Sequence, residues 1–230
     1  MTLPRVVVVT GTDTAVGKTV VTAALAASIR SHRKVAVLKP AQTGVGPHDP
    51  GDADEVRRLS GVESVHECVR LRDPLAPTTA AGREGVALPS VAAYAATASE
   101  LATTHDVVLL EGAGGLLVGL DNDGAGLCEL TSALDESFGF VVVARAGLGT
   151  LNHTGLTVEA LRRRAHPILG LVVGSVPKRP GLAEQTNLAD LEAVTGVPLI
   201  GGVPAGAGSM PPTEFRSAAP SWFGPPIARA

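Results

Sequence analysis

The sequence is poor in cysteine, aromatic residues and basic charge, and each shortage excludes a class of function. Its 230 residues include only two cysteines, Cys68 and Cys128. They supply neither a metal cage nor a disulfide framework, so we expect reduced thiols in the core. Aromatic residues make up 3%, too few for a surface that stacks nucleic-acid bases. Lys+Arg total 19 against 22 Asp+Glu, a net charge of −3, which disfavours binding to nucleic acid or an anionic membrane.

Long hydrophobic runs are also missing. No stretch approaches the roughly 18 apolar residues of a membrane-spanning helix, and the valines at 6–9 are too few for the apolar part of a secretory signal. We therefore expect a cytoplasmic protein. Hydrophobic residues still make up 45% of the chain, enough to bury a core, so the 27 glycines and 17 prolines predict tight turns rather than disorder.

Short valine-rich runs alternate with helical patterns along the chain. Runs typical of buried strands are Val6–Val9, Val35–Leu38, Val107–Leu110 and Phe140–Ala144, with Ile168–Val173 and Leu199–Ile200 as further candidates. Apolar residues at helical spacing lie within 21–29, 91–101, 151–161 and 188–194. The alternation predicts an α/β fold, a single-domain, doubly wound, mostly parallel sheet flanked by helices. We place this domain at residues 1–204. Residues 205–230 then form a Gly/Pro/Ala-rich tail that packs loosely on it or trails from it, with Phe215, Trp222 and Phe223 as candidate anchors.

The most specific motif is the segment Gly11-Thr-Asp-Thr-Ala-Val-Gly-Lys-Thr19, which follows a predicted strand and opens a predicted helix. Backbone N–H groups in such a loop bind phosphate oxygens. Lys18 would add a charge at the β- and γ-phosphates, and Thr19 a hydroxyl for Mg²⁺. Five residues rather than four separate the two glycines, so a glycine-rich turn with a surface lysine is the alternative interpretation.

Charged residues follow two other predicted strands. Lys39 ends the second strand, and Glu111 follows the strand Val107–Leu110. Ligands of open parallel sheets bind at the carboxyl ends of the strands, so Lys39 would serve an anionic substrate and Glu111 would hold Mg²⁺. A solvated lysine and an ordinary tight turn are the alternatives.

Two segments at predicted helix starts are less specific. Asp52 opens a helical pattern after a Gly/Pro-rich loop, and Gly149-Thr150-Leu151-Asn152 joins a strand to a helix. The free N–H groups of the second segment could hold a carboxylate. Both segments are equally compatible with ordinary helix capping.

Taken in order, these motifs resemble the dethiobiotin synthetases. The resemblance rests on Gly11–Thr19, Lys39-Pro-Ala-Gln-Thr-Gly44, the pair Asp52-Ala53, Glu111-Gly-Ala-Gly-Gly115 and Gly149-Thr-Leu-Asn-His-Thr154, and it extends from about Val6 to Pro204. It implies a P-loop NTPase fold and a homodimer with active sites at the subunit interface. The implied activity is a ligase reaction of biotin biosynthesis, in which 7,8-diaminononanoate takes up CO₂, ATP phosphorylates the carbamate, and the second amine closes a cyclic urea.

The resemblance also implies roles for individual residues. Lys39, Lys18 and Thr14 would be catalytic, and Thr19, Asp52 and Glu111 would hold Mg²⁺. Substrate would contact Lys39, Thr43 and the segment Gly149, Thr150, Leu151 and Asn152, the last four from the partner subunit. Nucleotide would contact Asp13, Thr14, Ala15, Val16, Gly17, Lys18, Thr19, Gly174 and Ser175.

Two positions depart from the pattern of the family. Ala15 stands where some relatives have a glutamate, and Gly174 stands where many have an asparagine that contacts adenine. Because glycine has no side chain to do so, we expect relaxed base selectivity, with CTP or other triphosphates accepted.

Three other functions fit less well. A switch ATPase of the partitioning or septum-placement type would carry a second lysine early in the loop, and Gly11-Thr12-Asp13 has none. A cobyrinate-type amide synthetase would need an additional glutaminase domain. A nucleotide-binding module without chemistry leaves the joint presence of Lys39 and Glu111 unexplained.

Overall fold

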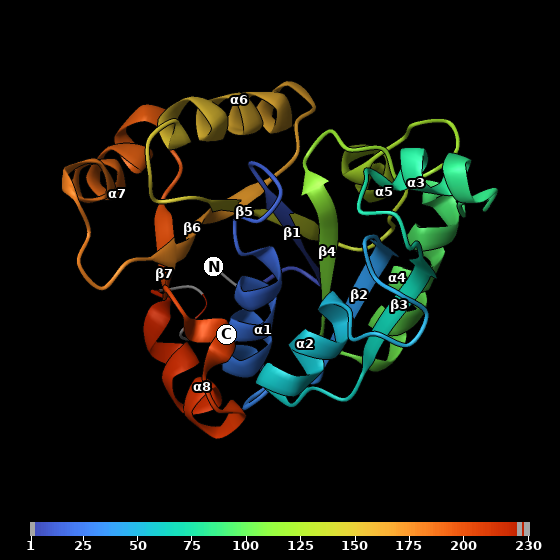
Figure 1. Ribbon diagram of the computed structural model, residues 1–230, viewed down its shortest axis with the longest axis horizontal. Helices are drawn as coiled ribbons and strands as arrows, with labels where there is room; N and C mark the ends of the chain where they lie inside the picture. Colours follow the sequence, from blue (N-terminus) through green and yellow to red (C-terminus); the bar gives the residue numbers. More distant parts are fainter. Residues whose placement is uncertain (1–2, 225–226, 228–230) are drawn as a thin grey trace.

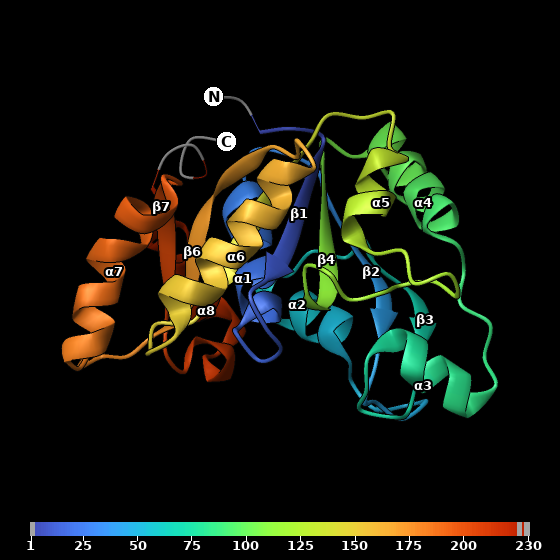
Figure 2. The same ribbon diagram turned by 90° about the horizontal axis from the view of Figure 1, so that it is seen from above.

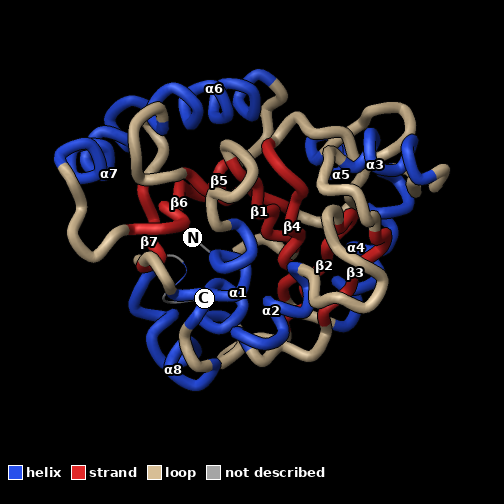
Figure 3. The backbone as a smooth tube through the Cα atoms, viewed as in Figure 1, coloured by secondary structure: helices blue, strands red, loops and turns tan. Residues whose placement is uncertain are grey.

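A parallel sheet forms the centre of the computed structural model, which describes residues 3–224 and 227. The strands are β1 Val6–Gly11, β2 Val35–Gln42, β3 Val65–Arg70, β4 Val107–Gly115, β5 Phe138–Ala144, β6 Ile168–Val176 and β7 Leu199–Pro204. Their order is β3-β2-β4-β1-β5-β6-β7, and every pairing is parallel. Figure 3 shows the strands as a central layer between helices. The predicted doubly wound α/β class is confirmed.

Helices cover both faces of the sheet. They are α1 Lys18–Ile29, α2 Asp52–Ser60, α3 Pro77–Glu84, α4 Val91–Thr104, α5 Leu127–Ser132, α6 Thr150–Arg163, α7 Leu182–Thr195 and α8 Pro212–Ala218, with 3₁₀ turns η1 Ala207–Ser209 and η2 Ala219–Trp222. In Figure 1, α6 and α7 lie above the sheet and α1, α2 and α8 below it. Figure 2 shows α3 near the β3 edge, at the far end of the molecule from α7. Among the described helices, none has the length and apolar character to cross a membrane.

The valine runs explain why the molecule has two apolar layers. Successive side chains of a strand point to opposite faces of the sheet. In β1, Val7 and Val9 belong to an apolar cluster with residues of α1, α2 and α8, whereas Val6 and Val8 belong to a second cluster with residues of α4 to α7. A strand buried on both faces needs apolar residues throughout rather than an alternating pattern, which is the composition of β1.

Three features differ from the sequence-based expectations. Strand β3 was missed because it forms an edge of the sheet and carries polar residues such as His66 and Glu67. Cys68 on this strand is exposed, so the expectation of two core thiols is wrong for Cys68, while Cys128 is buried. Within the described residues, the segment after β7 packs more closely than expected, through two of its predicted anchors, Phe215 and Phe223, which are buried. The rings of Phe215 and Trp222 meet edge to face with centroids 5.1 Å apart.

The strand order determines where in the molecule the residues of the predicted site meet. β2, β4 and β1 are neighbours, and their carboxyl ends meet at one edge of the sheet. Lys39 lies near the end of β2, Glu111 lies in β4, and the phosphate loop follows β1. Residues that are far apart in the sequence are therefore brought together by the topology alone.

Candidate active site

The phosphate loop connects β1 to α1 through an unusual backbone. Ala15 and Gly17 have positive φ angles of 57° and 97°, the left-handed conformation that favours glycine. This path starts α1 at Lys18 without a side-chain cap, so the helix depends on other acceptors for its first N–H groups. A helix N-terminus of this kind attracts anions. The Lys18 ammonium folds back over the loop and donates to the carbonyl oxygen of Asp13 at 3.0 Å.

Beside the loop, a buried lysine sits between two carboxylates. Lys39 Nζ lies 2.6 Å from Asp52 Oδ2 and 2.8 Å from Glu111 Oε1, and it donates to the carbonyl of Gly112 at 3.2 Å. Thr19 Oγ1 donates to the same Glu111 oxygen at 3.0 Å. The structure thus brings Lys39, Thr19, Asp52 and Glu111 together, although they come from four separate elements.

Burial and neighbouring charges shift the pKa values of Lys39 and Asp52 in opposite directions. Burial alone would lower the pKa of Lys39, but the charges of Glu111 and Asp52 outweigh it and raise the pKa above its ordinary value. Burial would raise the pKa of Asp52, but the charge and hydrogen bond of Lys39 lower it. Lys18 lacks such close partners, so burial and the nearby charge of Lys39 lower its pKa. The cluster therefore holds a firmly charged ammonium, that of Lys39, beside the ionised carboxylate of Asp52.

A cavity of about 430 Å³ opens beside this cluster. Its lining combines loop residues, both lysines and small residues from the ends of β2 and β4: Thr14, Ala15, Gly17, Lys18, Thr19, Val20, Lys39, Ala41, Gln42, Thr43, Asp52, Ala113 and Gly114. The volume and the convergent polar groups suit a small ligand. Thr14 and Thr43, which the sequence assigned to the same site, both line it.

Gly174 contacts the loop through its backbone. A Cβ atom built on Gly174 would lie 2.0 Å from the carbonyl oxygen of Val16, and one built on Gly17 would lie 2.7 Å from the carbonyl oxygen of Gly174. The close approach of β6 to the loop therefore requires glycine at 174. Ser175, the next residue, is exposed.

The segment at the start of α6 lies apart from this cavity. Gly149 to Asn152 form its first turn, with Gly149 at φ 87° and Thr150 buried. Within the described part of the chain, none of these four residues lines the cavity around Lys39.

Two residues near the site were not singled out by the sequence. Gln42 is buried, and its Oε1 accepts the backbone N–H of Asp52 at 2.8 Å, which fixes the start of α2. Arg145 forms an ion pair of 2.7 Å with Asp13 of the phosphate loop. Gln42 lies inside the motif Lys39–Gly44 at the end of β2 and could have been considered there. No sequence motif marks Arg145, because its role depends on a contact between two separate loops.

Comparisons with known proteins place the chain in a family. The model of a family described as an AAA domain matches residues 5–213. The chain is 55% identical to the ATP-dependent dethiobiotin synthetase BioD of Streptomyces coelicolor over 223 residues, covering 96% of this chain and 93% of the relative. It is 55% identical to the protein of the same name in Rhodococcus jostii, covering 95% of this chain and 94% of the relative.

Solved structures with the same fold are more distant in sequence. The septum site-determining protein MinD of Pyrococcus horikoshii, complexed with Mg-ADP, has a TM-score of 0.57 at 17% identity, with coverage of 94% of this chain and 95% of that one. A ParA family ATPase of Chlorobium tepidum has a TM-score of 0.55 at 13% identity, with coverage of 94% and 90%. At these identities the likeness shows the fold alone. The sequence relatives are decisive, and the chain belongs to the family of ATP-dependent dethiobiotin synthetases.

Proposed function

We propose that this enzyme joins 7,8-diaminononanoate and CO₂ into the cyclic urea of dethiobiotin at the expense of ATP. The observation that carries the proposal is the buried Lys39 beside the phosphate loop. It places a fixed positive charge where two anions, a carbamate and a triphosphate, would have to approach each other. Family membership supplies the substrate class.

The proposed chemistry needs no covalent bond to the enzyme. One amine of the substrate adds to CO₂, and a carbamate oxygen then attacks the γ-phosphorus of ATP, with ADP leaving. The first nitrogen has already lost one proton when the carbamate forms. The second amine then attacks the carbonyl carbon of the mixed anhydride, the C–O bond to phosphate breaks, and this second nitrogen loses one proton as the ring closes. Catalysis of this kind depends on positioning and charge stabilisation, which fits a site built from two lysines and a phosphate loop.

The nucleotide would lie along the loop. Backbone N–H groups of residues 13–19 would bind its phosphates, with the backbone of Gly174 and Ser175 on the other side. In this arrangement Lys18 would exchange the carbonyl of Asp13 for phosphate oxygens. Thr14 lines the cavity between the loop and Lys39 and is a candidate for contact with the transferring phosphoryl group.

The residues present fit a magnesium ion. Thr19, Asp52 and Glu111 offer one hydroxyl and two carboxylates within one cluster, and Mg²⁺ prefers such oxygen donors together with phosphate oxygens and water. When bound, the ion would neutralise charge on the phosphates.

The three hydrogen bonds of Lys39 are directed at Asp52, Glu111 and Gly112, so contact with a carbamate requires Lys39 to release at least one of them.

A homodimer is the assembly that we propose. A groove of about 430 Å³ beside the loop is lined by residues of the loop, the β4–α5 connection and α6. Leu117 and Leu156 line this groove with 65% and 58% of their surface exposed, and Leu148 nearby in sequence is 83% exposed. Thr12 Oγ1 and His153 Nδ1 also belong to the groove and are buried without a described hydrogen-bond partner. Apolar side chains and unpaired polar atoms on one face are typical of a surface that another subunit covers.

The dimer would also complete the substrate site. The start of α6 has free N–H groups that suit the carboxylate of the diamine, but it does not line the cavity of its own Lys39. We therefore assign Gly149, Thr150, Leu151 and Asn152 to the active site of the partner subunit, while Thr43 would contact the amine end of the substrate in its own.

We propose relaxed selectivity for the nucleobase. Gly174 has no side chain, and the close contact of its backbone with Val16 leaves no room for one. Initial rates with ATP, CTP, GTP and UTP test this point. Comparable kcat/KM values for at least two triphosphates are expected, and a strict preference for ATP would contradict the proposal.

Leaving out one component at a time tests the function itself. Phosphate release and dethiobiotin formation are measured with Mg²⁺, ATP, bicarbonate and the diamine, then with each omitted. Both products should depend on all four components and form in equal amounts. Phosphate release that is the same without the diamine would instead indicate a switch ATPase.

A further inference from the structure

We propose that Arg145 positions the phosphate loop for nucleotide binding through its ion pair with Asp13. Arg145 directly follows β5, and Asp13 lies two residues after the end of β1. These strands are parallel neighbours in which Gly11 pairs with Val143, so the residues two further along each chain meet at the same edge of the sheet. Arg145 Nη2 lies 2.7 Å from Asp13 Oδ2. The pair thereby ties the loop after β1 to the loop after β5.

Asp13 connects the ion pair with Arg145 to the groups that would bind the nucleotide. Its Oδ1 accepts the backbone N–H of Thr14 at 2.7 Å, and its carbonyl oxygen accepts Lys18 Nζ at 3.0 Å. One residue thus holds a loop N–H group and the Lys18 ammonium in place before nucleotide binds, and in the proposed function phosphate oxygens then replace the Asp13 carbonyl as the acceptor of Lys18. If Asp13 shifts, both donors shift with it.

The loop needs support from outside because its own conformation is costly. Ala15 adopts a positive φ of 57° although it is not glycine. Between Thr12 and Gly17, three contacts with neighbouring elements hold the loop in place. The N–H of Thr12 donates to the carbonyl of Val143 at 3.0 Å, Asp13 pairs with Arg145, and Gly17 packs on the backbone of Gly174. Of these three external contacts, the one from Arg145 is made by a side chain, and the other two are made by backbone.

The solvent exposure of the Arg145–Asp13 pair distinguishes a role in positioning the loop from a role in stabilising the fold. The side chains of Arg145 and Asp13 are 42% and 51% exposed. Ion pairs with this exposure contribute little to folding, so loss of the pair should leave the melting temperature almost unchanged. A positioning role predicts instead a specific loss of nucleotide affinity. The inference rests on the proposed function insofar as it takes the loop to bind nucleotide.

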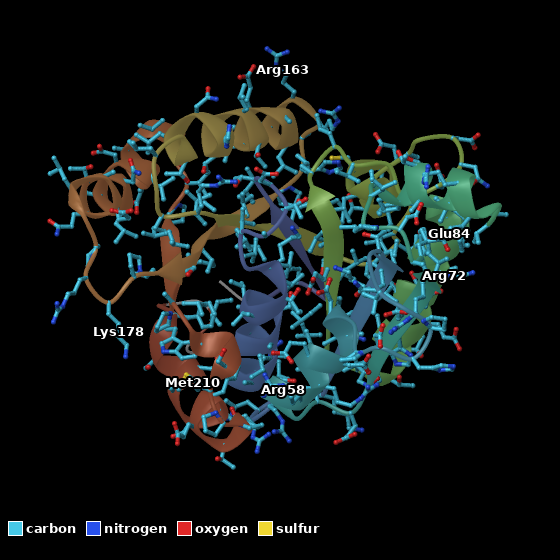
Figure 4. The ribbon with its side chains drawn as sticks, viewed as in Figure 1. Arg58, Arg72, Glu84, Arg163, Lys178 and Met210 are labelled. Carbon is cyan, nitrogen blue, oxygen red and sulfur yellow. The ribbon has the colours of Figure 1, made fainter. Side chains whose placement is uncertain are left out.

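The test compares Arg145→Gln and Asp13→Asn with a matched control. Asn at position 13 keeps an acceptor for the Thr14 N–H but removes the charge that pairs with Arg145. Arg163→Gln is the control, because Arg163 forms an exposed ion pair with Glu159 at 2.5 Å on α6 and points away from the sheet (Figure 4). Titration calorimetry with Mg-ADP gives Kd for each full-length protein, and steady-state rates give KM for ATP.

We expect each variant to raise Kd for Mg-ADP by about tenfold, since small displacements of binding groups weaken a preorganised site. The control should bind like wild type, all melting temperatures should agree, and Arg145→Lys should recover part of the affinity. The double variant should bind Mg-ADP no more weakly than either single variant, because both substitutions remove the same ion pair.

Two results would overturn the inference. Unchanged Kd in Arg145→Gln excludes a positioning role, and additive losses in the double variant mean that Arg145 acts on the nucleotide directly rather than through Asp13. Failure of the proposed function is distinguishable from both, since wild-type protein would then bind Mg-ADP with the same pattern among the variants but form no dethiobiotin.

Discussion

Lys39 is the residue on which the proposed reaction most depends. It is buried, and three oxygen atoms surround its ammonium group. We expect Lys39→Ala to lower kcat by about 10²–10³-fold or more, because a charge that stabilises the transferring phosphoryl group is lost. Binding of Mg-ADP, measured by calorimetry, should persist, since Lys18 and the loop remain. Lys34→Ala, which removes an exposed lysine, is the control.

The removal of Lys39 also leaves Asp52 and Glu111 without their cation, which costs stability. Melting temperature is therefore recorded together with the rate, and Lys39→Arg provides a variant that keeps the charge. A Lys39→Ala protein that is folded and fully active would show that the assigned role is wrong.

Gly174 gives a second prediction at the residue scale. A methyl group at this position would overlap the carbonyl of Val16, so Gly174→Ala must push β6 and the phosphate loop apart. We expect a loss of about 1–3 kcal/mol of stability, as for other overpacked sites, together with weaker Mg-ADP binding. Denaturant unfolding and calorimetry measure the two effects.

Gly82→Ala is the matched control for that substitution. Gly82 lies inside α3, and a Cβ atom added there would meet nothing within 4 Å beyond the backbone of its own helix. Because alanine favours helices, this change should stabilise the protein by about 0.5–1 kcal/mol. Equal effects of the two substitutions would refute the close-packing role of Gly174.

At the scale of elements, α8 joins the chain after β7 to the core. Phe215 on this helix is fully buried and packs edge to face on Trp222. We expect Phe215→Ala to lower the free energy of unfolding by about 3–5 kcal/mol, the usual cost of deleting a buried ring. Leu182→Ala, at a side chain that is 81% exposed, should change it by less than about 0.5 kcal/mol. A loosely attached tail would instead make both changes equally mild.

The elements also show what sequence can predict. β1, β2, β4 and β5 were predicted because strands buried on both faces consist of uninterrupted apolar residues. β3 was missed because an edge strand is partly solvated and carries polar residues. The short α5 has too few turns for a helical pattern to be recognised.

The same contrast applies to the site. The phosphate loop, Lys39, Asp52 and Glu111 were predicted because each lies in a contiguous motif at the end of a strand or the start of a helix, and the structure brings them together. Arg145 and the packing of Gly174 on Val16 depend on contacts between separate elements. Such contacts leave no periodic or local signal in the sequence.

At the scale of the whole molecule, the proposed dimer shares residues between its two active sites. A Lys39→Ala chain lacks the charge in its own site, and an Asn152→Asp chain presents a carboxylate that repels the substrate carboxylate in the partner's site. Each variant alone should be inactive at low diamine concentration. In mixed dimers one of the two sites has both groups intact.

Mixing the two variants after mild dissociation measures this arrangement. Random reassociation should restore about a quarter of wild-type activity, because half of the dimers are mixed and each has one working site. No recovery, although sedimentation confirms that subunits have exchanged, would mean that each site is built within a single chain.

The central claim is that ATP activates a carbamate formed from CO₂. Its most direct test is a single turnover with ¹⁸O-labelled CO₂ in unlabelled water, stopped before the label exchanges with solvent, followed by mass spectrometry of the released phosphate. The account predicts one ¹⁸O atom per phosphate for each dethiobiotin formed, since the carbamate oxygen that attacks phosphorus leaves with it. Unlabelled phosphate alongside labelled dethiobiotin would contradict the account.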